Sequence, residues 1–579
     1  MNSYWINSEK NKEKYNKVEK NIETDICIIG GGITGISTAY YLTKENLKVT
    51  VLDMGKIGFQ TTGNSTAKIT SQHGLFYKDL KDSKGEDFAR LYYDANEDAI
   101  KNIKKIVEKE KIQCDLECQS AYVLAANREE VQKVKDEVEV VRGFGGHAEY
   151  LEREDIDKNL LILNPLAAIR FKNQAQFNSY KYTIELAKIC KNLGANIYEN
   201  TKVVDVRDEK DYYYLETEDG YKIKAKYLVI TTKYPIINIP GFYFMKMYQS
   251  TSYGISIPVK EKLFDGMYIT STNPKVSLRM AKVDNNIIKD VVDGNIENYA
   301  KQDKENRKRV KEKQNSKIDN EYVLIVVGAD HKTGEKTDLS NSYKKLENIA
   351  KQIYPQGKVE NYWNTEDCIT LDKIPYIGKY SNMWENAHVA TGFNKWGITT
   401  SNIAANIITD MIIGRKNRYE DIFISTRVEP VKNRQEVGNM LKETVSSLVL
   451  KKFELPESEQ ASLKNEEGKI IEIEGEKVGA YKDKEGRIYT IVPKCAHLGC
   501  ELSWNNLDKT WDCPCHGSRY DYTGKMLYGP TVKDTREEHG KDAYGQIKPP
   551  NCGGLGVAGH NMSHLKSCIL YFALYIIFL

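Results

Sequence analysis

The 579-residue chain lacks a strong net charge and an apolar leader. Its formal net charge of +3 is too small to indicate nucleic acid or a membrane as a partner, and no stripe of Lys and Arg with interleaved aromatic residues occurs. The first twenty residues are mostly polar and charged, without the apolar segment of a secretory signal. We therefore expect a cytoplasmic protein that binds no nucleic acid. Its length predicts more than one domain.

Cysteine is also sparse, because eleven residues cannot form a disulfide framework in a chain of this length. Four of the eleven nevertheless lie in two short boxes that also contain histidine, Cys495-Ala-His497-Leu-Gly-Cys500 and Cys513-Pro-Cys515-His516. A Rieske centre holds one iron by two thiolates and the other by two imidazoles, and therefore needs two Cys and two His on facing loops. The boxes predict a metal site, and an iron-sulfur cluster in particular.

The two boxes resemble those of the Rieske family, in which Cys-x-His is followed, here after fifteen residues, by Cys-x-x-His. The resemblance implies that Cys495, His497, Cys513 and His516 are the ligands of a [2Fe-2S] cluster. Short alternating segments that begin at Lys469, Lys477 and Arg487 precede the boxes and predict strands. We therefore expect an all-β Rieske domain at residues 462–534.

The remaining cysteines resemble those of the Rieske subunits of respiratory and photosynthetic cytochrome complexes. That resemblance implies a disulfide between Cys500 and Cys515. It also implies that Ser518 and Tyr520 donate hydrogen bonds to the cluster and to a ligand sulfur. Such bonds stabilise the reduced cluster, so we expect a potential in the upper half of the range of roughly −150 to +300 mV.

Zinc is the alternative occupant, because Cys-x-His with Cys-x-x-His could form a tetrahedral Cys₂His₂ site. Zinc would not explain the second cysteine of each box or the run Gly517-Ser-x-Tyr520. The iron-sulfur interpretation accounts for both.

A second cofactor is predicted near the N-terminus. An apolar strand from Thr24 leads into Gly30-Gly31-Gly32-Ile-Thr-Gly35, a helical segment follows, and a second strand ends in Asp53. Glycines in such a turn allow a tight bend, close approach to a pyrophosphate and tight packing of the helix on the strand. An acid about twenty residues further on binds a ribose hydroxyl. The alternative is a tight turn without a ligand. The pattern favours a dinucleotide, but it does not distinguish FAD from NAD.

Later segments make that choice. The order of a strand from Gly194 to Val203, a strand near Ala225 and the glycine-rich stretch Ala390-Thr-Gly392-Phe-Asn-Lys-Trp-Gly397-Ile398 resembles the FAD-dependent oxidoreductases of the D-amino-acid oxidase and glycine oxidase superfamily. The resemblance implies bound FAD, with Gly392, Gly397 and Ile398 near the isoalloxazine and Val203 near the adenine. It also implies an α/β Rossmann-like domain and an antiparallel substrate-domain sheet over the flavin.

Together the two halves resemble a bacterial family of fusions between such an oxidoreductase and a C-terminal Rieske domain, with residues 61–74 especially similar. The predicted divisions are an N-terminal extension (1–23), the FAD-dependent oxidoreductase (24–424), a linker helix (425–461), the Rieske domain (462–534) and an atypical tail (535–579). Within the oxidoreductase we expect FAD-binding segments at about 24–80, 175–240 and 365–424, substrate-domain segments at about 81–174 and 241–364, and a charged insertion at 282–320.

Three residues are candidates for contact with substrate. Arg279 could clamp a carboxylate through a bidentate pair, His331 could lie at the same mouth, and the loop of His73 is expected to approach the flavin. Each has an ordinary alternative, since an Arg on a strand is usually solvated and a His in a turn or polar loop is usually satisfied locally. The catalytic residues therefore stay open.

The pair of cofactors predicts an oxidoreductase. We expect hydride transfer from a small amine, amino acid or hydroxy acid to the flavin, followed by one-electron transfer to the cluster and to an external acceptor. This predicts a dehydrogenase rather than an oxidase. An iron oxygenase is disfavoured, because nine histidines provide no visible mononuclear site of two His and a carboxylate. A non-enzymatic electron-transfer or redox-sensing protein remains the alternative.

The tail departs from the Rieske pattern. Residues 535–559 are polar and rich in Gly and Pro, and residues 568–579 are almost entirely apolar. Twelve apolar residues are fewer than the about twenty that span a bilayer. We expect membrane contact, if any, only through this tail.

Overall fold

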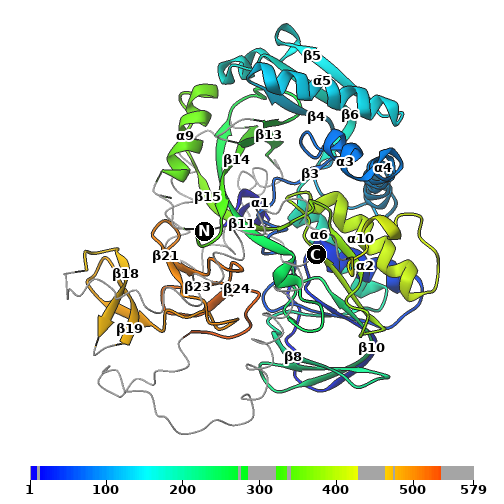
Figure 1. Ribbon diagram of the computed structural model, residues 1–579, viewed down its shortest axis with the longest axis vertical. Coiled ribbons are helices and arrows are strands. Elements are labelled where there is room, and N and C mark those ends of the chain that lie inside the picture. Colours follow the sequence, from blue (N-terminus) through cyan, green and yellow to red (C-terminus); the bar gives the residue numbers. More distant parts are fainter. Residues whose placement is uncertain are drawn as a thin grey trace, which may run out of the picture.

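The computed structural model describes residues 2–9, 13–271, 275–283, 321–335, 339, 341–427, 463–473 and 476–535. Most of the predicted charged insertion and linker helix, and the tail after Thr535, lie outside the described residues. Two large sheets and a separate β domain form the described molecule (Figure 1). None of the described helices combines the length and the apolarity needed to cross a bilayer.

The first sheet has a parallel core, as the Rossmann-like prediction requires. Its strands run in the order β16, β17, β10, β1, β2, β7, and β9 and β8 extend from β10 as a hairpin. Strand β1 pairs in parallel with β10 and β2, and its Ile26–Ile29 run is buried on both faces, as expected for a central strand. The bounds are β1 (Ile22–Ile29), β2 (Val49–Leu52), β7 (Asn196–Tyr198), β8 (Val203–Asp208), β9 (Tyr213–Thr217), β10 (Lys222–Ile230), β16 (Tyr376–Lys379) and β17 (Ala387–Thr391).

Helices pack against this sheet and against one another. Helix α2 (Ile33–Lys44) contacts both α10 (Gly397–Ile412) and α6 (Ser179–Asn192). Thr34 Oγ1 lies 2.8 Å from Ser401 Oγ, which joins the N-terminal turns of α2 and α10. Two helices that begin about 360 residues apart in sequence therefore start at the same edge of the sheet.

The second sheet is antiparallel except for the parallel pair of β12 with β4. Its order is β15, β11, β14, β13, β12, β4, β6, β3, with β5 beside β6. The prediction of an antiparallel substrate-domain sheet is confirmed. The bounds are β3 (Lys68–Ile69), β4 (Glu117–Ala125), β5 (Ala148–Glu152), β6 (Ala167–Gln176), β11 (Met247–Val259), β12 (Met267–Thr270), β13 (Val276–Lys282), β14 (Tyr322–Lys332) and β15 (Asn361–Thr370).

Helices cover the outer side of the second sheet. Helix α9 (Ser342–Ile353) packs on β14 and β11, and α5 (Arg128–Gly143) packs on β4, β5 and β6 at the top of Figure 1. Helices α3 (Tyr77–Lys84) and α4 (Glu86–Lys109) lie between this sheet and α10. The remaining short helical turns are η1 (Arg153–Asp155), η2 (Lys158–Leu163), η3 (Tyr243–Met245) and η5 (Glu420–Ile422).

The predicted N-terminal extension is part of the core. Helix α1 (Tyr4–Ser8) buries Trp5 and Ile6 to 2% and 1% exposure, and Trp5 Nε1 donates to Ser65 O. Gly63 leaves room for Ile6, since a Cβ at Gly63 would lie 2.8 Å from its side chain. The polar composition of the segment concealed this role, because two apolar side chains are enough to anchor it.

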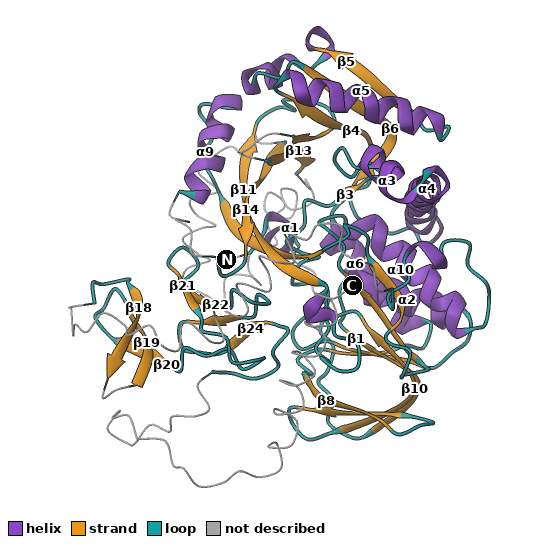
Figure 2. Cartoon of the chain, in the orientation of Figure 1, coloured by secondary structure: helices purple, strands orange, loops and turns teal. Residues whose placement is uncertain are grey.

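The C-terminal domain consists of strands and loops in its described residues (Figure 2). One sheet contains β18 (Gly468–Ile473), β19 (Glu476–Lys482) and β20 (Ile488–Ile491), which confirms the three strands predicted there. The other contains β21 (Ser503–Asn505), β22 (Thr510–Asp512), β23 (Arg519–Asp521) and β24 (Met526–Tyr528). The first Cys/His box follows β20, and the second connects β22 to β23.

Candidate active site and metal centre

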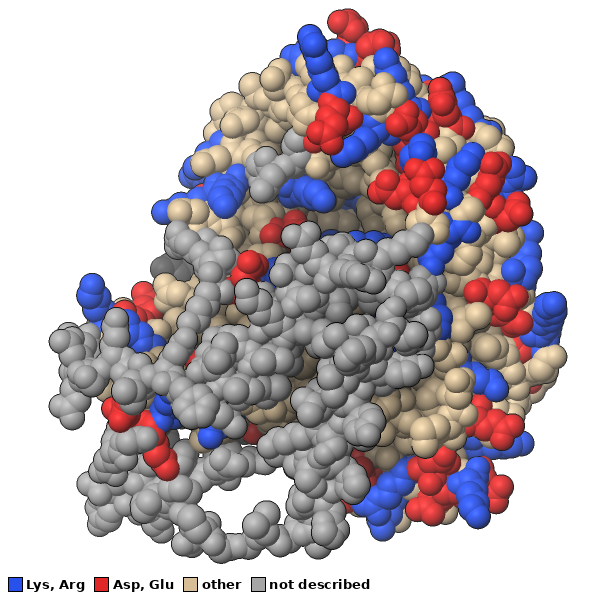
Figure 3. Space-filling model, in the orientation of Figure 1, with Lys and Arg blue, Asp and Glu red and all other residues tan. Residues whose placement is uncertain are grey.

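A cavity of about 840 Å³ has walls from both large sheets. Seven of the nine residues expected to bind the dinucleotide line it: Gly30, Gly32, Asp53, Val203, Gly392, Gly397 and Ile398. Gly31 and Gly35 do not line it. The basic and acidic residues are mixed over the visible described surface around it, in keeping with the small net charge (Figure 3).

The glycine turn after β1 is built by close backbone contacts. Gly30 has a φ of +107°, and a Cβ there would lie 2.7 Å from Thr231 O. A Cβ at Gly35 would lie 1.9 Å from Gly30 O, so α2 can approach the turn only because this residue has no side chain. The backbone can thus come close to a ligand at the N-terminus of α2, where the helix dipole favours an anion.

Asp53 stands at the end of β2, where a ribose-binding acid is expected. Its Oδ2 accepts a hydrogen bond from Gly31 N (2.8 Å) and its Oδ1 accepts one from Gly55 N (2.7 Å). Burial raises the pKa of this carboxyl, and the two backbone hydrogen bonds oppose the rise. Gly31 N therefore holds Asp53 in place. Val203, at the start of β8, lines the same end of the cavity.

The other end of the cavity meets the N-terminus of α10. Gly392 has a φ of +71°, and a Cβ there would lie 2.2 Å from Thr370 Cγ2. Gly397 and Ile398 are the first two residues of α10. The first backbone N–H groups of a helix have no partner within it and carry partial positive charge. This end of the cavity therefore suits a group that gains negative charge, such as a flavin ring on reduction.

His73 lines the cavity, but both of its ring nitrogens have partners. Nε2–H donates to Thr70 O (3.2 Å), so Nδ1 accepts from Tyr92 Oη–H (3.1 Å). The ring stacks on Trp396 at 4.6 Å between centroids. Burial lowers the pKa of His73 to about 3, so the ring is neutral at physiological pH. His73 thus lies at the cavity wall, but its ring has no lone pair left for a substrate proton.

Arg279 does not line the cavity, so the structure gives no support to its predicted role as a substrate clamp. Its Nη1 donates to the carbonyl oxygens of Thr66, Ala67 and Phe177, and the guanidinium lies over the ring of Trp5. Arg279 therefore holds the loop that precedes β3. The physical reason is that the Arg279 side chain extends from β13 to backbone carbonyl oxygens that need a hydrogen-bond donor.

His331 is also placed away from the cavity lining. Its ring stacks on Tyr253 with centroids 5.8 Å apart, and both ring nitrogens are buried without a hydrogen-bond partner among the described residues. Burial lowers its pKa, while the carboxylates of Asp512 and Asp508 in the C-terminal domain act in the opposite direction. His331 thus belongs to the contact between the two halves of the chain, and its predicted place at a substrate mouth has no support.

The structure brings together the four residues predicted to hold the cluster. Cys495 and Cys513 are buried free thiols, and each is held by hydrogen bonding to the other. The rings of His497 and His516 lie 5.0 Å apart at 86°. Within the part of the chain that the structure describes, both Nδ1 atoms are buried without a hydrogen-bond partner. Two thiols and two partnerless imidazole nitrogens at one place are the donor set of a Rieske cluster, so these residues fit that group.

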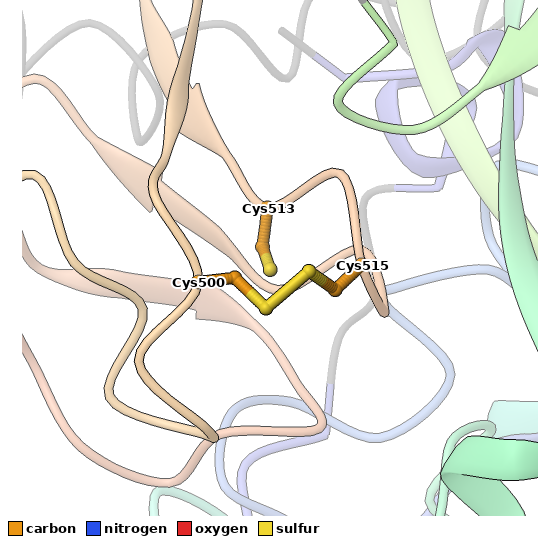
Figure 4. A group of neighbouring side chains, drawn as sticks. All are labelled: Cys500, Cys513 and Cys515. Carbon is orange, nitrogen blue, oxygen red and sulfur yellow. A yellow bond between two sulfur atoms is a disulfide. The ribbon is translucent and has the colours of Figure 1, made fainter. Parts of the chain in front are cut away.

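The two remaining cysteines are bonded to each other beside this site. The Sγ atoms of Cys500 and Cys515 form a disulfide, and Cys513 Sγ lies within 4.8 Å of both (Figure 4). Sulfurs joined in this way are not thiolates, so the disulfide is a neighbour of the metal site rather than a source of ligands. The disulfide links the two boxes to each other.

Tyr520 lies against a predicted ligand, as the sequence indicated. Its Oη is 3.4 Å from Cys495 Sγ and accepts a hydrogen bond from Ala496 N (2.9 Å). Its hydroxyl hydrogen is then directed at the sulfur. Ser518 also hydrogen-bonds Cys495, and its Oγ accepts from Thr531 N (3.3 Å). Both hydroxyls can stabilise negative charge on the sulfur.

The histidine edge of the metal site is covered by the flavin half of the chain. His497 Nε2–H donates to Asn238 Oδ1 (2.6 Å), and a bond from this nitrogen leaves Nδ1 as the donor atom for a metal. Phe244 places its ring edge-on to both imidazoles, at 6.0 Å from His497 and 5.6 Å from His516. Asn238 and Phe244 follow β10, about 250 residues before the boxes.

Gln249 of β11 connects the second box to the wall of the cavity. Its Nε2 donates to the carbonyl oxygens of His516 and Gly529, each at 2.8 Å. A Cβ at Gly517 would lie 2.6 Å from Gln249 Cβ, so the two backbones are as close as a glycine permits. Gly529 lines the cavity, together with Met526, Tyr528, Thr531 and Val532 of the C-terminal domain. The metal-binding domain therefore forms part of the cavity wall.

A buried cluster of charges lies at the same contact. Arg519 is 1% exposed and pairs with Glu366 of β15, with Asp508 (2.7 Å) and with Asp512 (2.9 Å). Burial alone would lower the pKa of Arg519, but the three carboxylates raise it well above its ordinary value. Lys233 Nζ lies 3.6 Å from Glu366 on the flavin side. The cluster was not predicted from the sequence, where its one visible signal is a charged residue between Ser518 and Tyr520.

Comparison with known proteins gives the same two parts. The sequence profile of the family described as FAD dependent oxidoreductase matches residues 25–411, and that of the Rieske [2Fe-2S] domain matches residues 454–539. Bacillus subtilis YhfW, whose name describes it as a Rieske 2Fe-2S iron-sulfur protein, is 33% identical over 92% of this chain and 97% of its own.

Solved structures support the fold of the first part. Glycine oxidase from Geobacillus kaustophilus superposes with a TM-score of 0.56 at 16% identity, covering 71% of this chain and all of its own. L-proline dehydrogenase from P. horikoshii superposes with a TM-score of 0.55 at 17% identity, covering 70% of this chain and 98% of its own. At these identities the similarity shows the fold alone.

Proposed function

Because the chain belongs to the family of FAD dependent oxidoreductases and carries a C-terminal Rieske [2Fe-2S] domain, we propose that it oxidises a small amine, amino acid or hydroxy acid and passes the electrons singly to an external acceptor. When bound, FAD accepts a hydride and a Rieske cluster carries one electron at a time, so the pair converts a two-electron oxidation into one-electron steps.

The contact at Gln249 is the observation that carries the proposal. One amide group binds the backbone of the predicted ligand His516 and the backbone of Gly529 in the cavity wall. Its neighbours Tyr248 and Ser250 line the cavity, as does Cys368, its partner in the β11–β15 pairing. The metal site and the flavin site therefore share a wall. Such an arrangement supports direct transfer within the chain.

Other residues of the chain would bind and orient the cofactors and substrate. Asp53 and Val203 would hold the adenosine end of FAD, and the N-terminus of α10 would face its ring. Cys495, His497, Cys513 and His516 would ligate the cluster. The second sheet forms a roof over the cavity with Val123, Ile269 and Val327, and these apolar side chains would exclude water from the reacting carbon.

We also propose that the protein works as a dehydrogenase. The cluster site lies against the cavity wall, so the next electron carrier is part of the same molecule, whereas oxygen must diffuse in. Electron flow towards the cluster is favoured further by the hydroxyls of Tyr520 and Ser518, which stabilise its reduced form.

The experiment is an anaerobic screen of the purified holoprotein with glycine, L-proline, putrescine and L-lactate. Flavin bleaching is followed by absorbance, and cluster reduction by low-temperature EPR on the same samples. We expect at least one compound to bleach the flavin and to produce the rhombic signal of a His-ligated cluster, and oxygen consumption to be slow compared with reduction of cytochrome c.

A matched variant separates the two cofactors. Cys513→Ser removes one proposed cluster ligand, and its flavin should still be bleached by the same substrate while cytochrome c reduction is largely lost. If none of the compounds bleaches the wild-type flavin and a reduced carrier protein does, the oxidoreductase proposal fails in favour of a non-enzymatic electron-transfer role.

A further inference from the structure

Lys68 is a buried lysine that lies at the roof of the cavity. It belongs to β3, at the edge of the second sheet, and is 8% exposed. Its Nζ donates to the carbonyl oxygen of Tyr268 in β12 (2.8 Å), and the residue lines the cavity. The amine therefore stands between the sheet and the space in which substrate would meet the flavin.

No carboxylate lies within ion-pair distance of Lys68 among the described residues, and its charged neighbour is the cation Arg279. Lys181 provides the contrast, because it is equally buried but pairs with Asp115 at 3.0 Å. Burial, and secondly the charge of Arg279, lower the pKa of Lys68 well below its ordinary value. Glu117 and Asp115 act on Arg279, and the nearby His73 is neutral. The surroundings thus favour an uncharged amine at Lys68.

A second polar group without a partner lies on the same part of the roof. Ser277 Oγ is buried and has no hydrogen-bond partner within the described chain, and Ser277 lines the cavity. Ser277 pairs with Ile269, the residue that follows Tyr268. The Lys68 amine and the Ser277 hydroxyl, two groups able to hydrogen-bond a ligand, therefore both belong to the part of the cavity wall built around β12, beside the apolar Ile269. Such convergent polar groups mark where the polar end of a small ligand binds.

A base at the site assists the oxidation of an amine or an alcohol by hydride loss. An amine substrate is an ammonium ion in water and must lose a proton before its nitrogen lone pair can assist departure of the hydride, and a hydroxy acid must lose its O–H proton. His73 has both nitrogens occupied, and Arg279 lies outside the cavity lining. Lys68 lines the cavity as well, and as an uncharged amine it has a free lone pair.

We propose that Lys68 Nζ accepts the proton that the substrate's amino or hydroxyl group loses when the adjacent C–H bond is oxidised. The substrate N–H or O–H bond breaks, a new N–H bond forms on Nζ, and the two electrons leave with the hydride to FAD. This role rests on the proposed function. Ser277 Oγ orients the same nitrogen or oxygen, and the Tyr268 carbonyl stabilises the ammonium that Lys68 becomes.

The charge state of Lys68 is tested without turnover. Proton titration of the wild-type holoprotein is compared with that of Lys68→Met and Lys68→Gln, the latter keeping an N–H donor for Tyr268. We expect the wild-type protein to bind one more proton than the variants, with a midpoint well below about pH 10.4, where an ordinary lysine titrates. A difference centred on the ordinary value would overturn the proposal, because a charged Lys68 could accept no proton.

The catalytic role is tested by stopped-flow flavin reduction, using whichever of glycine, L-proline, putrescine or L-lactate reduces the wild-type protein. In both Lys68 variants the flavin should be reduced about 10² to 10⁴-fold more slowly, and the acidic limb of the pH profile should be lost. Lys246→Met is the control, because Lys246 is a half-buried lysine, with a pKa lowered to about 8 by burial, that does not line the cavity. Reduction at the wild-type rate in both Lys68 variants would overturn the proposal.

The two levels of failure are distinguishable. If no compound reduces the wild-type flavin, the proposed function fails and the catalytic role of Lys68 fails with it, even where the titration finds a neutral amine. If the wild-type protein is reduced and the Lys68 variants match it, the proposed function stands and the base lies elsewhere.

Discussion

Arg519 of the C-terminal domain donates to Glu366 of the second sheet across a contact in which both side chains are almost wholly excluded from solvent. Two further carboxylates in its own domain surround the same guanidinium. Desolvating four charges is costly unless each is paired, and removing one partner of a buried pair usually costs about 3–5 kcal/mol. The cluster of charges therefore fixes how the two halves dock.

Replacing Glu366 by Gln should loosen this docking, because Arg519 then has partners only within its own domain. We expect the rate of cluster reduction by the flavin to fall while the rate of flavin reduction by substrate stays near the wild-type value. Stopped-flow absorbance, with freeze-quench EPR for the cluster, measures the two rates separately. Glu129→Gln is the control, because it removes a carboxylate from an exposed ion pair. Equal cluster reduction in the two variants would show that the charges do not position the domain.

Replacing Tyr520 by Phe should lower the reduction potential of the cluster. The change removes a hydroxyl that lies 3.4 Å from Cys495 Sγ. A hydrogen bond to a charged group contributes about 1.5 kcal/mol, and this corresponds to about 60 mV for one electron. An EPR-monitored redox titration gives the value. Tyr522→Phe serves for comparison, since Tyr522 packs on Tyr481 and Tyr489 instead. If the reduction potential is the same in the wild-type protein and in both variants, Tyr520 does not affect the potential of the cluster.

Replacing Arg279 by Gln should lower stability rather than substrate affinity. The guanidinium binds three backbone carbonyls and lies over Trp5, so its loss leaves buried acceptors without donors. We expect a loss of about 3 kcal/mol or more in the free energy of unfolding. Denaturant titration measures this loss, and the substrate concentration for half-maximal flavin reduction should be unchanged. A large rise in that concentration with normal stability would restore the clamp that the sequence suggested.

His73 should make the fold sensitive to acid. Its folded pKa of about 3 lies below the ordinary histidine value near 6.5, so the unfolded chain binds more protons between these limits. The stability contributed by the neutral ring is fully present above about pH 6.5 and is lost as the pH falls towards 3. His73→Gln should be less stable at pH 8 but should lose less stability between pH 6.5 and 4. Thermal unfolding at several pH values checks this, and parallel curves for the two proteins would contradict it.

The parts that sequence could predict are local. Three patterns are of this kind: the cysteine and histidine boxes, the glycine turn with Asp53, and the turn before α10. Each lies within a short segment whose spacing reflects one physical requirement. Strands β18, β19 and β20 were visible for the same reason, since alternation is read within each strand. For such residues, the pattern that indicates their role is formed by their neighbours in the sequence.

The parts that sequence could not predict join distant segments. Trp5 packs under Arg279, Asn238 binds His497, and Gln249 binds the backbone of His516. In each case an ordinary side chain gains its role from a partner more than 250 residues away. The contacts of Arg279 could not be foreseen for the same reason, because its partners are carbonyl oxygens, which have no signature in a sequence. Lys68 of β3 lies within the stretch 61–74 noted above, but nothing in the sequence distinguished it from the surrounding polar residues.

The strand and turn from Met526 to Val532 complete the wall of the cavity in the first half of the chain. During synthesis that first half emerges without this stretch of wall, so a tight fit for its cofactor has to wait for the last domain to fold. If the two halves were produced as separate chains, the cavity would lack the part of its wall that the C-terminal domain contributes. We therefore expect the cavity to reach its final shape only after the C-terminal domain has folded and docked.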